Sequence, residues 1–394
     1  MAIYPPEDYM RLALAAAQKC QVEESKVNPR VGVVVVRHGE VLAEAYRGEL
    51  AEGEHAEYTA LERKLSGKSV EGADVYTTLE PCIWRNSPKI PCARRLIDRR
   101  VGRVFIGMLD PDVRVHGRGM MDLADAGIDV QMFSKEASQG AKALNAEFVR
   151  DRRARYGFGT PVGEPVTVGS LRIVTRTLNE LLPGHPPTRV DIRYPEVSSG
   201  MSALQARELN SAFEGTAIAA LHELRRLEGA RRNDPEISET GEDLIERGLR
   251  VTLADHGFLS LLTFEVEEAF MFRPSVRTSS LTYSLTQSVR RIDLGDLGWK
   301  VDHHTWLSSY CAKALLLENA RDGNNLTDES MIADGTKPAK VERWPFALTP
   351  EGLLFVFDTE STGCVAWGAH DVLVPYEDLR EVIAVDSLLE PLLR

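Results

Sequence analysis

The stretch TLEPCIWRNSPKIPC, residues 78–92, decides the fold of the first part of this chain. It begins at the end of ADVYTTL (73–79), a predicted strand, and ends where PCARRLIDRR (91–100) predicts a helix opened by proline. Cys82 and Cys92, two of the five cysteines, each follow a proline. A strand that passes through a loop into a helix predicts one repeating unit of an α/β domain.

The same alternation of strands and helices extends in both directions from this stretch. Apolar patterns and turn residues predict strands at 31–36, 41–46, 103–109 and 128–133, and helices at 5–20, 53–65, 119–127 and 134–156. Strands that alternate with helices predict a mixed, largely parallel sheet between two helical layers.

The pattern changes after GFGTPVGEPVTVG, residues 157–169, which has the glycine and proline content of a linker. Strand patterns at 170–179 and 188–197 precede a predicted long helix at 202–229. Further strand patterns follow within 249–270, 276–286, 346–358 and 371–383. The sequence therefore predicts an α/β domain at 1–156, a linker at 157–170, and an α+β domain with a mostly antiparallel sheet at 171–394.

Composition limits the kinds of protein that this chain can be. Its 394 residues exceed one hydrophobic core, and 43% hydrophobic with 27% charged residues are ordinary for a soluble protein. The start has no signal-peptide pattern and no apolar run is long enough to span a bilayer, which predicts a cytoplasmic protein without membrane contact. An odd number of cysteines argues against a disulfide framework and favours metal binding or burial.

Charge is distributed unevenly along the chain. Residues 1–160 hold 24 Lys and Arg against 23 Asp and Glu, whereas the remainder holds 23 against 36. This asymmetry supports two domains. It also argues against broad nucleic-acid binding by the second one, because phosphate neutralisation needs clustered Lys and Arg.

Three short motifs together predict a zinc site: His-Ala-Glu at 55–57 and the two Pro-Cys pairs. Zinc deaminases hold Zn²⁺ with one His and two Cys, and a Glu two residues after the His moves protons. We therefore predict His55, Cys82 and Cys92 as ligands, and Glu57 as the group that takes a proton from a zinc-activated water. Each residue alone is more often a packed side chain, and Cys20, Cys311 and Cys364 are interpreted that way.

These motifs resemble the cytidine-deaminase-like superfamily, and specifically the deaminase half of bifunctional riboflavin-biosynthesis deaminase/reductases. The resemblance covers about residues 5–153 and depends on the segments NPRVGVVVV, HAEYTAL, TLEPC, PCARRLI, DPDVRVHGRGM and LADAGIDV. It implies the three-layer fold of that superfamily, substrate-base contact by Asn28, and a place for Asp110 in the substrate pocket. From the residues alone, Asn28 can equally cap a turn, and Asp110 a loop.

At three places the sequence departs from the family pattern. Gly48 stands where the family usually has a His, and Asp112 where it commonly has Asn. Nine residues, which begin Ile83-Trp84, separate the two cysteines where the family has eight that begin Ser-His. We therefore expect retained chemistry and an altered substrate contact. The candidate contacts are Trp84 and, for a phosphate, Arg85, Lys89 and Arg118, each of which can also be solvated surface.

The second half lacks the glycine-rich phosphate loop that a reductase domain would carry. Instead VDIRYPEV, FLSLLTFEVEE and FALTPEGLLFVFD, within about 188–383, resemble the C-terminal domain of lysozyme-sensing anti-sigma factors. That resemblance implies a protein-binding or assembly role for residues 171–394. His303, His304 and His370 are interpreted as surface residues in preference to a second metal site, and Trp299, Trp306, Trp344 and Trp367 as core or interface residues.

The leading hypothesis is a zinc hydrolase that deaminates an amino-pyrimidine or related nucleobase on a small nucleotide or nucleoside. The first alternative is a deaminase of bases in single-stranded nucleic acid, suggested by the arginines at 94, 95, 99, 100, 150, 152, 153 and 155. The second is a sensor or scaffold that binds a protein partner through 171–394. By resemblance, we expect a homo-oligomer.

Overall fold

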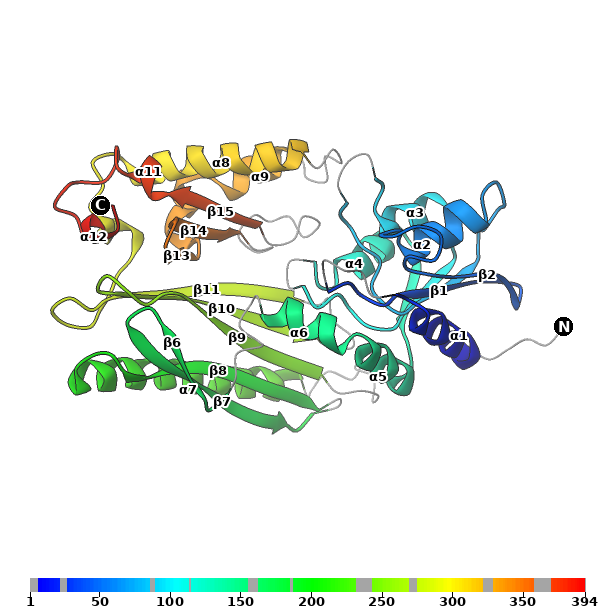
Figure 1. Cartoon of the computed structure of the whole chain (residues 1–394), viewed down its shortest axis with the longest axis horizontal. Coiled ribbons are helices and arrows are strands. Elements are labelled where there is room, and N and C mark those ends of the chain that lie inside the picture. Colours follow the sequence, from blue (N-terminus) through cyan, green and yellow to red (C-terminus); the bar gives the residue numbers. More distant parts are fainter. Residues whose placement is uncertain are drawn as a thin grey trace. The chain divides into compact units, whose positions relative to one another are not determined.

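A computed structural model describes residues 6–21, 27–85, 89–112, 115–154, 162–184, 187–231, 243–268, 275–321, 329–357 and 370–393. The chain divides into two compact units, residues 1–153 and residues 154–320 with 325–394, and each is described by itself (Figure 1). Strand β6 (Pro165–Val168) falls inside the stretch expected to be a linker, of which residues 157–161 lie outside the described chain. Among the described residues, no helix has the length and apolar character that crossing a membrane requires.

The first unit contains a five-stranded mixed sheet with the strand order β2-β1-β3-β4-β5. Its strands are β1 (Gly32–Arg37), β2 (Glu40–Tyr46), β3 (Asp74–Thr77), β4 (Arg103–Ile106) and β5 (Asp129–Met132). His38 and Gly39 both have positive φ, so a two-residue turn reverses the chain and pairs β1 with β2 antiparallel. Strand β1 also pairs antiparallel with β3, and parallel pairing is confined to β3-β4-β5.

Helices cover both faces of this sheet, as predicted. They are α1 (Pro6–Gln18), α2 (Ala56–Tyr58), the π-helix η1 (Thr59–Lys64), α3 (Cys92–Asp98), α4 (Arg118–Asp125), α5 (Lys135–Leu144) and α6 (Ala146–Ala154). Because side chains alternate along a strand, Val34 of β1 packs with α1 on one face, and Val33 packs with α2, η1 and α3 on the other. Gly32 allows α1 to approach closely, since a Cβ there would lie 2.1 Å from the carbonyl oxygen of Ala13.

Two predicted helices of this unit differ from the structure. The helix expected at 53–65 begins only at Ala56 and continues as a π-helix after one short α-helical segment. The closing helix expected at 134–156 is divided at Asn145 into α5 and α6. The division follows from a long-range contact, because the Asn145 side chain hydrogen-bonds the backbone of Arg30.

The second unit contains a seven-stranded sheet with the order β12-β11-β10-β9-β8-β7-β6. Its other strands are β7 (Leu171–Leu182), β8 (Thr188–Ser199), β9 (Asp243–Leu253), β10 (Phe258–Glu268), β11 (Ser275–Ser284) and β12 (Arg290–Arg291). Every neighbouring pair is antiparallel except β8 and β9, between which the chain forms the long helix α7 (Ala203–Arg231). Side chains of α7 pack on this sheet, so the predicted mostly antiparallel α+β architecture is confirmed.

A smaller sheet and several helices complete the second unit. Strands β13 (Phe346–Leu348), β14 (Gly352–Phe357) and β15 (His370–Pro375) form an antiparallel sheet. With it lie η2 (Leu294–Leu297), α8 (His303–Arg321), α9 (Glu329–Gly335), η3 (Pro338–Arg343), α11 (Tyr376–Leu379) and α12 (Glu390–Leu393). Helix α8 was not predicted from the sequence. Its buried Cys311 packs in one core with Trp344, while Cys364 and Trp367 lie outside the described residues.

Candidate metal centre

Three segments of the first unit bring the predicted zinc ligands together. His55 directly precedes α2, Cys82 lies in the loop after β3, and Cys92 is the first residue of α3. His55 Nδ1 lies 3.6 Å from Cys82 Sγ and 3.4 Å from Cys92 Sγ. Tetrahedral zinc with Zn–S of about 2.3 Å and Zn–N of about 2.0–2.1 Å would separate these atoms by about 3.5 Å. The spacing of the donor atoms therefore fits a zinc ion.

The two thiols interact so closely that their protonation is linked. The hydrogen bond from Cys92, together with His55, lowers the pKa of Cys82 well below its usual range. The same Cys82–Cys92 contact, together with burial, raises the pKa of Cys92 well above its usual range. The backbone N–H of Cys92 also donates to Cys82 Sγ at 3.3 Å, which stabilises a thiolate there. A divalent cation would replace the proton that the two sulfurs share.

Glu57 lies beside this cluster and is buried, with 3% of its surface exposed. Thr77 Oγ1, at the end of β3, donates to Glu57 Oε1 at 3.4 Å. Burial raises the pKa of the Glu57 carboxyl. A buried carboxyl that binds a proton more readily than usual is suited to accept a proton and to return it.

A second buried carboxylate, Glu80, organises the segment that contains Asp110. Its Oε2 accepts hydrogen bonds from the backbone N–H groups of Asp110 and Gly117, both at 2.9 Å, and its Oε1 accepts one from Met120 at 3.1 Å. A Cβ on Gly119 would lie 2.0 Å from the carbonyl oxygen of Pro81, which directly precedes Cys82. The described part of segment 110–120 is therefore fixed against the loop that presents a zinc ligand.

Glu80 was not among the residues predicted from the sequence, and neither was Asn145, which has a similar structural role. Asn145 Oδ1 accepts from the backbone N–H of Arg30 at 2.7 Å, and its Nδ2 donates to the Arg30 carbonyl at 3.0 Å. This pair of bonds fixes the segment that follows Asn28. The position of Glu80, an acidic residue between a buried strand and a Pro-Cys pair, could have indicated its importance from the sequence. Nothing in the sequence near Asn145 indicated its role, because its partner lies 115 residues away.

The predicted substrate contacts differ in how accessible they are. Asn28 is partly exposed, and its Oδ1 accepts a hydrogen bond from Arg47 at 3.3 Å. Asp110 is partly exposed, and its Oδ1 accepts from the N–H of Asp112 at 2.9 Å. Although part of the residue is exposed, the protein around its carboxyl displaces water, and this desolvation is the main reason why the pKa of Asp110 is raised to about 7. Arg118, at the start of α4, is only 4% exposed.

The described part of the loop between the two cysteines combines one anchor with exposed side chains. Ile83 is buried in the core of the first unit, whereas the next residue, Trp84, is 46% exposed. Arg85 Nη2 lies 3.5 Å from the carbonyl oxygen of Gly53, and Lys89 is exposed. Residues 86–88 lie outside the described chain. The aromatic ring and the two cations are thus available to solvent close to Cys82 in the sequence.

Comparison with known proteins identifies the class of this region. Residues 4–108 match the family model for the cytidine and deoxycytidylate deaminase zinc-binding region. Together with the His55, Cys82 and Cys92 cluster, the match defines the first unit as a zinc-binding deaminase region.

Two curated proteins illustrate what this region is similar to. The chain is 40% identical over 154 residues to the riboflavin biosynthesis protein RibD of Escherichia coli, covering 39% of each chain. It is 37% identical over 133 residues to the diaminohydroxyphosphoribosylamino-pyrimidine deaminase of Schizosaccharomyces pombe, covering 33% of this chain and 32% of that one. The chain thus spans less than two fifths of the length of these curated relatives.

One solved structure matches a larger share of this chain than the two curated relatives do. It is a member of the DUF3298 family from Bacteroides fragilis, 15% identical, which covers 58% of this chain and 99% of that chain with a TM-score of 0.44.

Proposed function

We propose that the first unit catalyses hydrolytic deamination of an amino-pyrimidine on a small nucleotide or nucleoside. The reaction replaces a C–NH₂ group by C=O and releases ammonia. The observation that supports this proposal best is the buried Glu57 carboxyl beside the His55, Cys82 and Cys92 cluster, inside a region that matches deaminases.

The proposed chemistry assigns a proton-transfer role to Glu57. His55, Cys82 and Cys92 would hold the zinc, which would supply a water whose pKa is lowered to about 7. The Glu57 carboxylate accepts a proton from the attacking water and delivers it to the ring nitrogen of the substrate. Glu57 then takes the second proton of that water from the added hydroxyl and passes it to the departing amine, so that the products are the carbonyl compound and ammonia and Glu57 is regenerated as a carboxylate.

The substrate class is inferred from the relatives and from the groups near the metal centre. The Schizosaccharomyces pombe relative is named for a phosphoribosylamino-pyrimidine. In this chain, we propose that Asn28 and Asp110 contact the base, and that Trp84 stacks on it or on its sugar. Arg85 and Lys89 are the proposed phosphate contacts because both cations are at least partly exposed. Arg118 could contribute only if the substrate reached its buried guanidinium.

The nucleic-acid alternative receives less support from the structure. Several of the arginines that suggested it are occupied by acidic partners: Arg94 with Asp98, Arg95 and Arg99 with Glu62, Arg100 with Glu71, and Arg152 with Asp151. Arg99 also donates to the backbone carbonyls of Leu61, Leu65 and Lys68, where it stabilises the end of η1. Five of the eight arginines thus have an acidic side chain within 4.0 Å. A protein-binding role for the second unit remains a separate proposal.

Ammonia release over a panel of pyrimidine nucleotides, nucleosides and single-stranded oligonucleotides tests the proposal. Turnover of a small amino-pyrimidine is expected, and turnover of oligonucleotides alone would support the nucleic-acid alternative. Glu57→Gln should lower kcat by about 10²–10⁴-fold while zinc stays bound, since the amide keeps the volume but cannot accept the proton. Glu52→Gln, at an exposed glutamate, is the matched control and should keep wild-type activity. Full activity in Glu57→Gln would refute the mechanism.

A further inference from the structure

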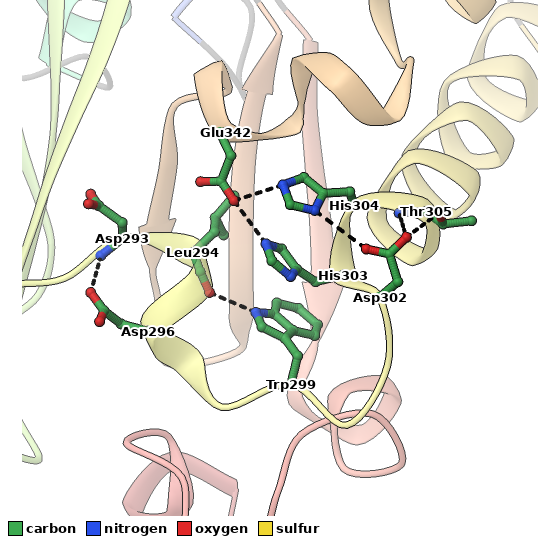
Figure 2. Close-up of polar contacts among 9 residues, drawn as sticks. All are labelled: Asp293, Leu294, Asp296, Trp299, Asp302, His303, His304, Thr305 and Glu342. Carbon is green, nitrogen blue, oxygen red and sulfur yellow. Dashed lines mark hydrogen bonds and ion pairs between the residues drawn. The ribbon is translucent and has the colours of Figure 1, made fainter.

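A compact group of imidazole and carboxylate side chains lies in the second unit, far along the sequence from the deaminase motifs. His303 and His304 form the first turn of α8, Asp302 directly precedes them, and Glu342 belongs to η3. Figure 2 shows the two imidazoles side by side, both facing the Glu342 carboxylate. The structure thus places these two histidines, which the sequence suggested were surface residues, at the start of a helix.

In both histidines it is the Nε2 atom that lies close to the Glu342 carboxylate. His303 Nε2 lies 2.9 Å and His304 Nε2 lies 3.0 Å from Glu342 Oε1 (Figure 2). A tetrahedral zinc with Zn–N and Zn–O of about 2.0–2.2 Å would separate such donors by about 3.4 Å. The separations between the imidazole nitrogens and the carboxylate oxygen would therefore open by about 0.4–0.5 Å when an ion binds between them. Asp302, His303 and His304 also offer ligand atoms that lie within 4.8 Å of one another.

The surroundings hold both rings in this orientation. Asp302 Oδ1 lies 3.4 Å from His304 Nδ1, the nitrogen that faces away from Glu342. A carboxylate at that position fixes a ligand histidine in the tautomer that leaves Nε2 free for a metal. The His303 ring stacks on Trp299 with 5.4 Å between centroids, and Trp299 Nε1 donates to the Leu294 carbonyl at 2.7 Å.

The charges and the adjoining space also suit a cation. The carboxylates of Asp302 and Glu342 outweigh the partial positive charge of about half a unit at the α8 N-terminus. Glu342 also lines a polar cavity of about 200 Å³ together with Thr278, Ser280, Arg343 and Trp344. Trp344 is 3% exposed, and its Nε1 has no hydrogen-bond partner among the described residues. Of the four residues in the group, Glu342 is the one that lines this cavity, so the space lies on the Glu342 side of the group.

We propose that His303, His304 and Glu342 form a second metal site, with Asp302 orienting His304. Two imidazole nitrogens with one carboxylate favour a borderline transition ion such as Zn²⁺ over Mg²⁺ or Ca²⁺, which prefer oxygen ligands. This site is independent of the proposed deaminase reaction, because it uses none of the residues of the first unit.

Cobalt titration of the metal-stripped full-length protein can distinguish the two sites. Co²⁺ bound at Cys82 and Cys92 gives intense sulfur-to-metal charge-transfer absorption, whereas Co²⁺ bound by imidazole and carboxylate gives weak visible bands only. We expect about two Co²⁺ per chain in the wild type. The double variant Cys82→Ser/Cys92→Ser should remove the charge-transfer absorption and leave the second ion. Only one Co²⁺ per chain in the wild type, with the charge-transfer absorption, would overturn the proposal.

Two substitutions that preserve local hydrogen bonds test the second site itself. Glu342→Gln keeps an oxygen that can accept from both imidazoles but loses the anionic ligand, so the second ion should bind at least tenfold more weakly. Asp302→Asn keeps a helix-capping side chain and should weaken the second ion about 10–100-fold. Both variants should retain the charge-transfer absorption and the wild-type circular dichroism, which shows that they are folded.

The matched control is His256→Asn, which removes an exposed imidazole elsewhere in the second unit. His256 has a φ of 52°, a conformation that Asn tolerates. This variant should bind about two Co²⁺ like the wild type. Unchanged affinity for the second ion in both Glu342→Gln and Asp302→Asn would refute the site, as would its loss in His256→Asn.

Discussion

Replacing Glu80 should release the segment that contains Asp110 from the loop that presents Cys82. The Glu80 carboxylate accepts hydrogen bonds from three backbone N–H groups, those of Asp110, Gly117 and Met120. Glu80→Ala removes the acceptors of one buried donor, the Gly117 N–H, and of two partly buried ones. A buried donor left without a partner costs about 1–3 kcal/mol, and a partly buried donor costs about 1 kcal/mol. The local free energy of opening of this segment should therefore fall by roughly 3 kcal/mol or more.

The distribution of the bonds over the two oxygens makes Glu80→Gln an informative comparison. Glu80 Oε2 accepts from Asp110 and Gly117, and Oε1 accepts from Met120. A glutamine can direct its single oxygen at the first two donors, but its NH₂ group then faces the Met120 N–H. One bond is lost instead of three, so the expected cost is about 1–3 kcal/mol.

Amide hydrogen exchange of the zinc-loaded protein measures these costs residue by residue. Since 1.4 kcal/mol corresponds to a factor of ten, Glu80→Ala should reduce protection of the amides of Asp110, Gly117 and Met120 by about 100-fold or more. Glu80→Gln should reduce it mainly at Met120. The amide of Phe105 in β4 serves as the internal control and should exchange as in the wild type. Unchanged protection at all three amides in Glu80→Ala would refute the reasoning, and an equal loss at Phe105 would indicate global destabilisation instead.

Three further predictions concern pH dependence, packing and thiol reactivity. Because the pKa of Asp110 is raised from 3.8 to about 7, the folded state binds a proton that the unfolded state lacks between about pH 4 and 7, and stability falls as pH rises through this range. Asp110→Asn should remove this decline, so the Tm of the variant should rise relative to that of the wild type from pH 5 to 7. A Tm difference that stays constant over this range would contradict the assignment. Gly119→Ala places a Cβ 2.0 Å from the Pro81 carbonyl oxygen, so thermal melts should show a loss of about 1–3 kcal/mol in stability. Gly215→Ala is the control, because its Cβ would meet no atom within 4 Å and should raise stability by about 0.5–1 kcal/mol. The same change in Tm in both variants would argue against the close contact at Gly119. Burial raises the pKa of the Cys311 thiol to about 12, so iodoacetamide at pH 8 should not alkylate it in the native protein. After unfolding, mass spectrometry should find Cys311 alkylated. Rapid labelling of the native protein would contradict its burial.

The sequence by itself determined the type of most elements and the chemistry of the first site. Runs of β-branched residues specify β1, and the alternation of strands and helices specifies the layered first unit. His55, Glu57 and the two Pro-Cys pairs identify a zinc-deaminase pattern because these residue types carry that chemistry at these spacings. These patterns involve residues that are close together in the sequence, so they can be recognised without the structure.

The tertiary structure alone decided which distant groups meet. Asn145 divides a predicted helix because it binds Arg30, 115 residues away, and Glu80 binds three amides that lie 30 to 40 residues further along the chain. His303 and Glu342 come together across 39 residues, although neither segment carries a metal motif. The physical reason is that periodicity and propensity depend on neighbours in sequence, whereas a buried polar group is satisfied by whichever donor or acceptor the packed fold places within hydrogen-bond distance.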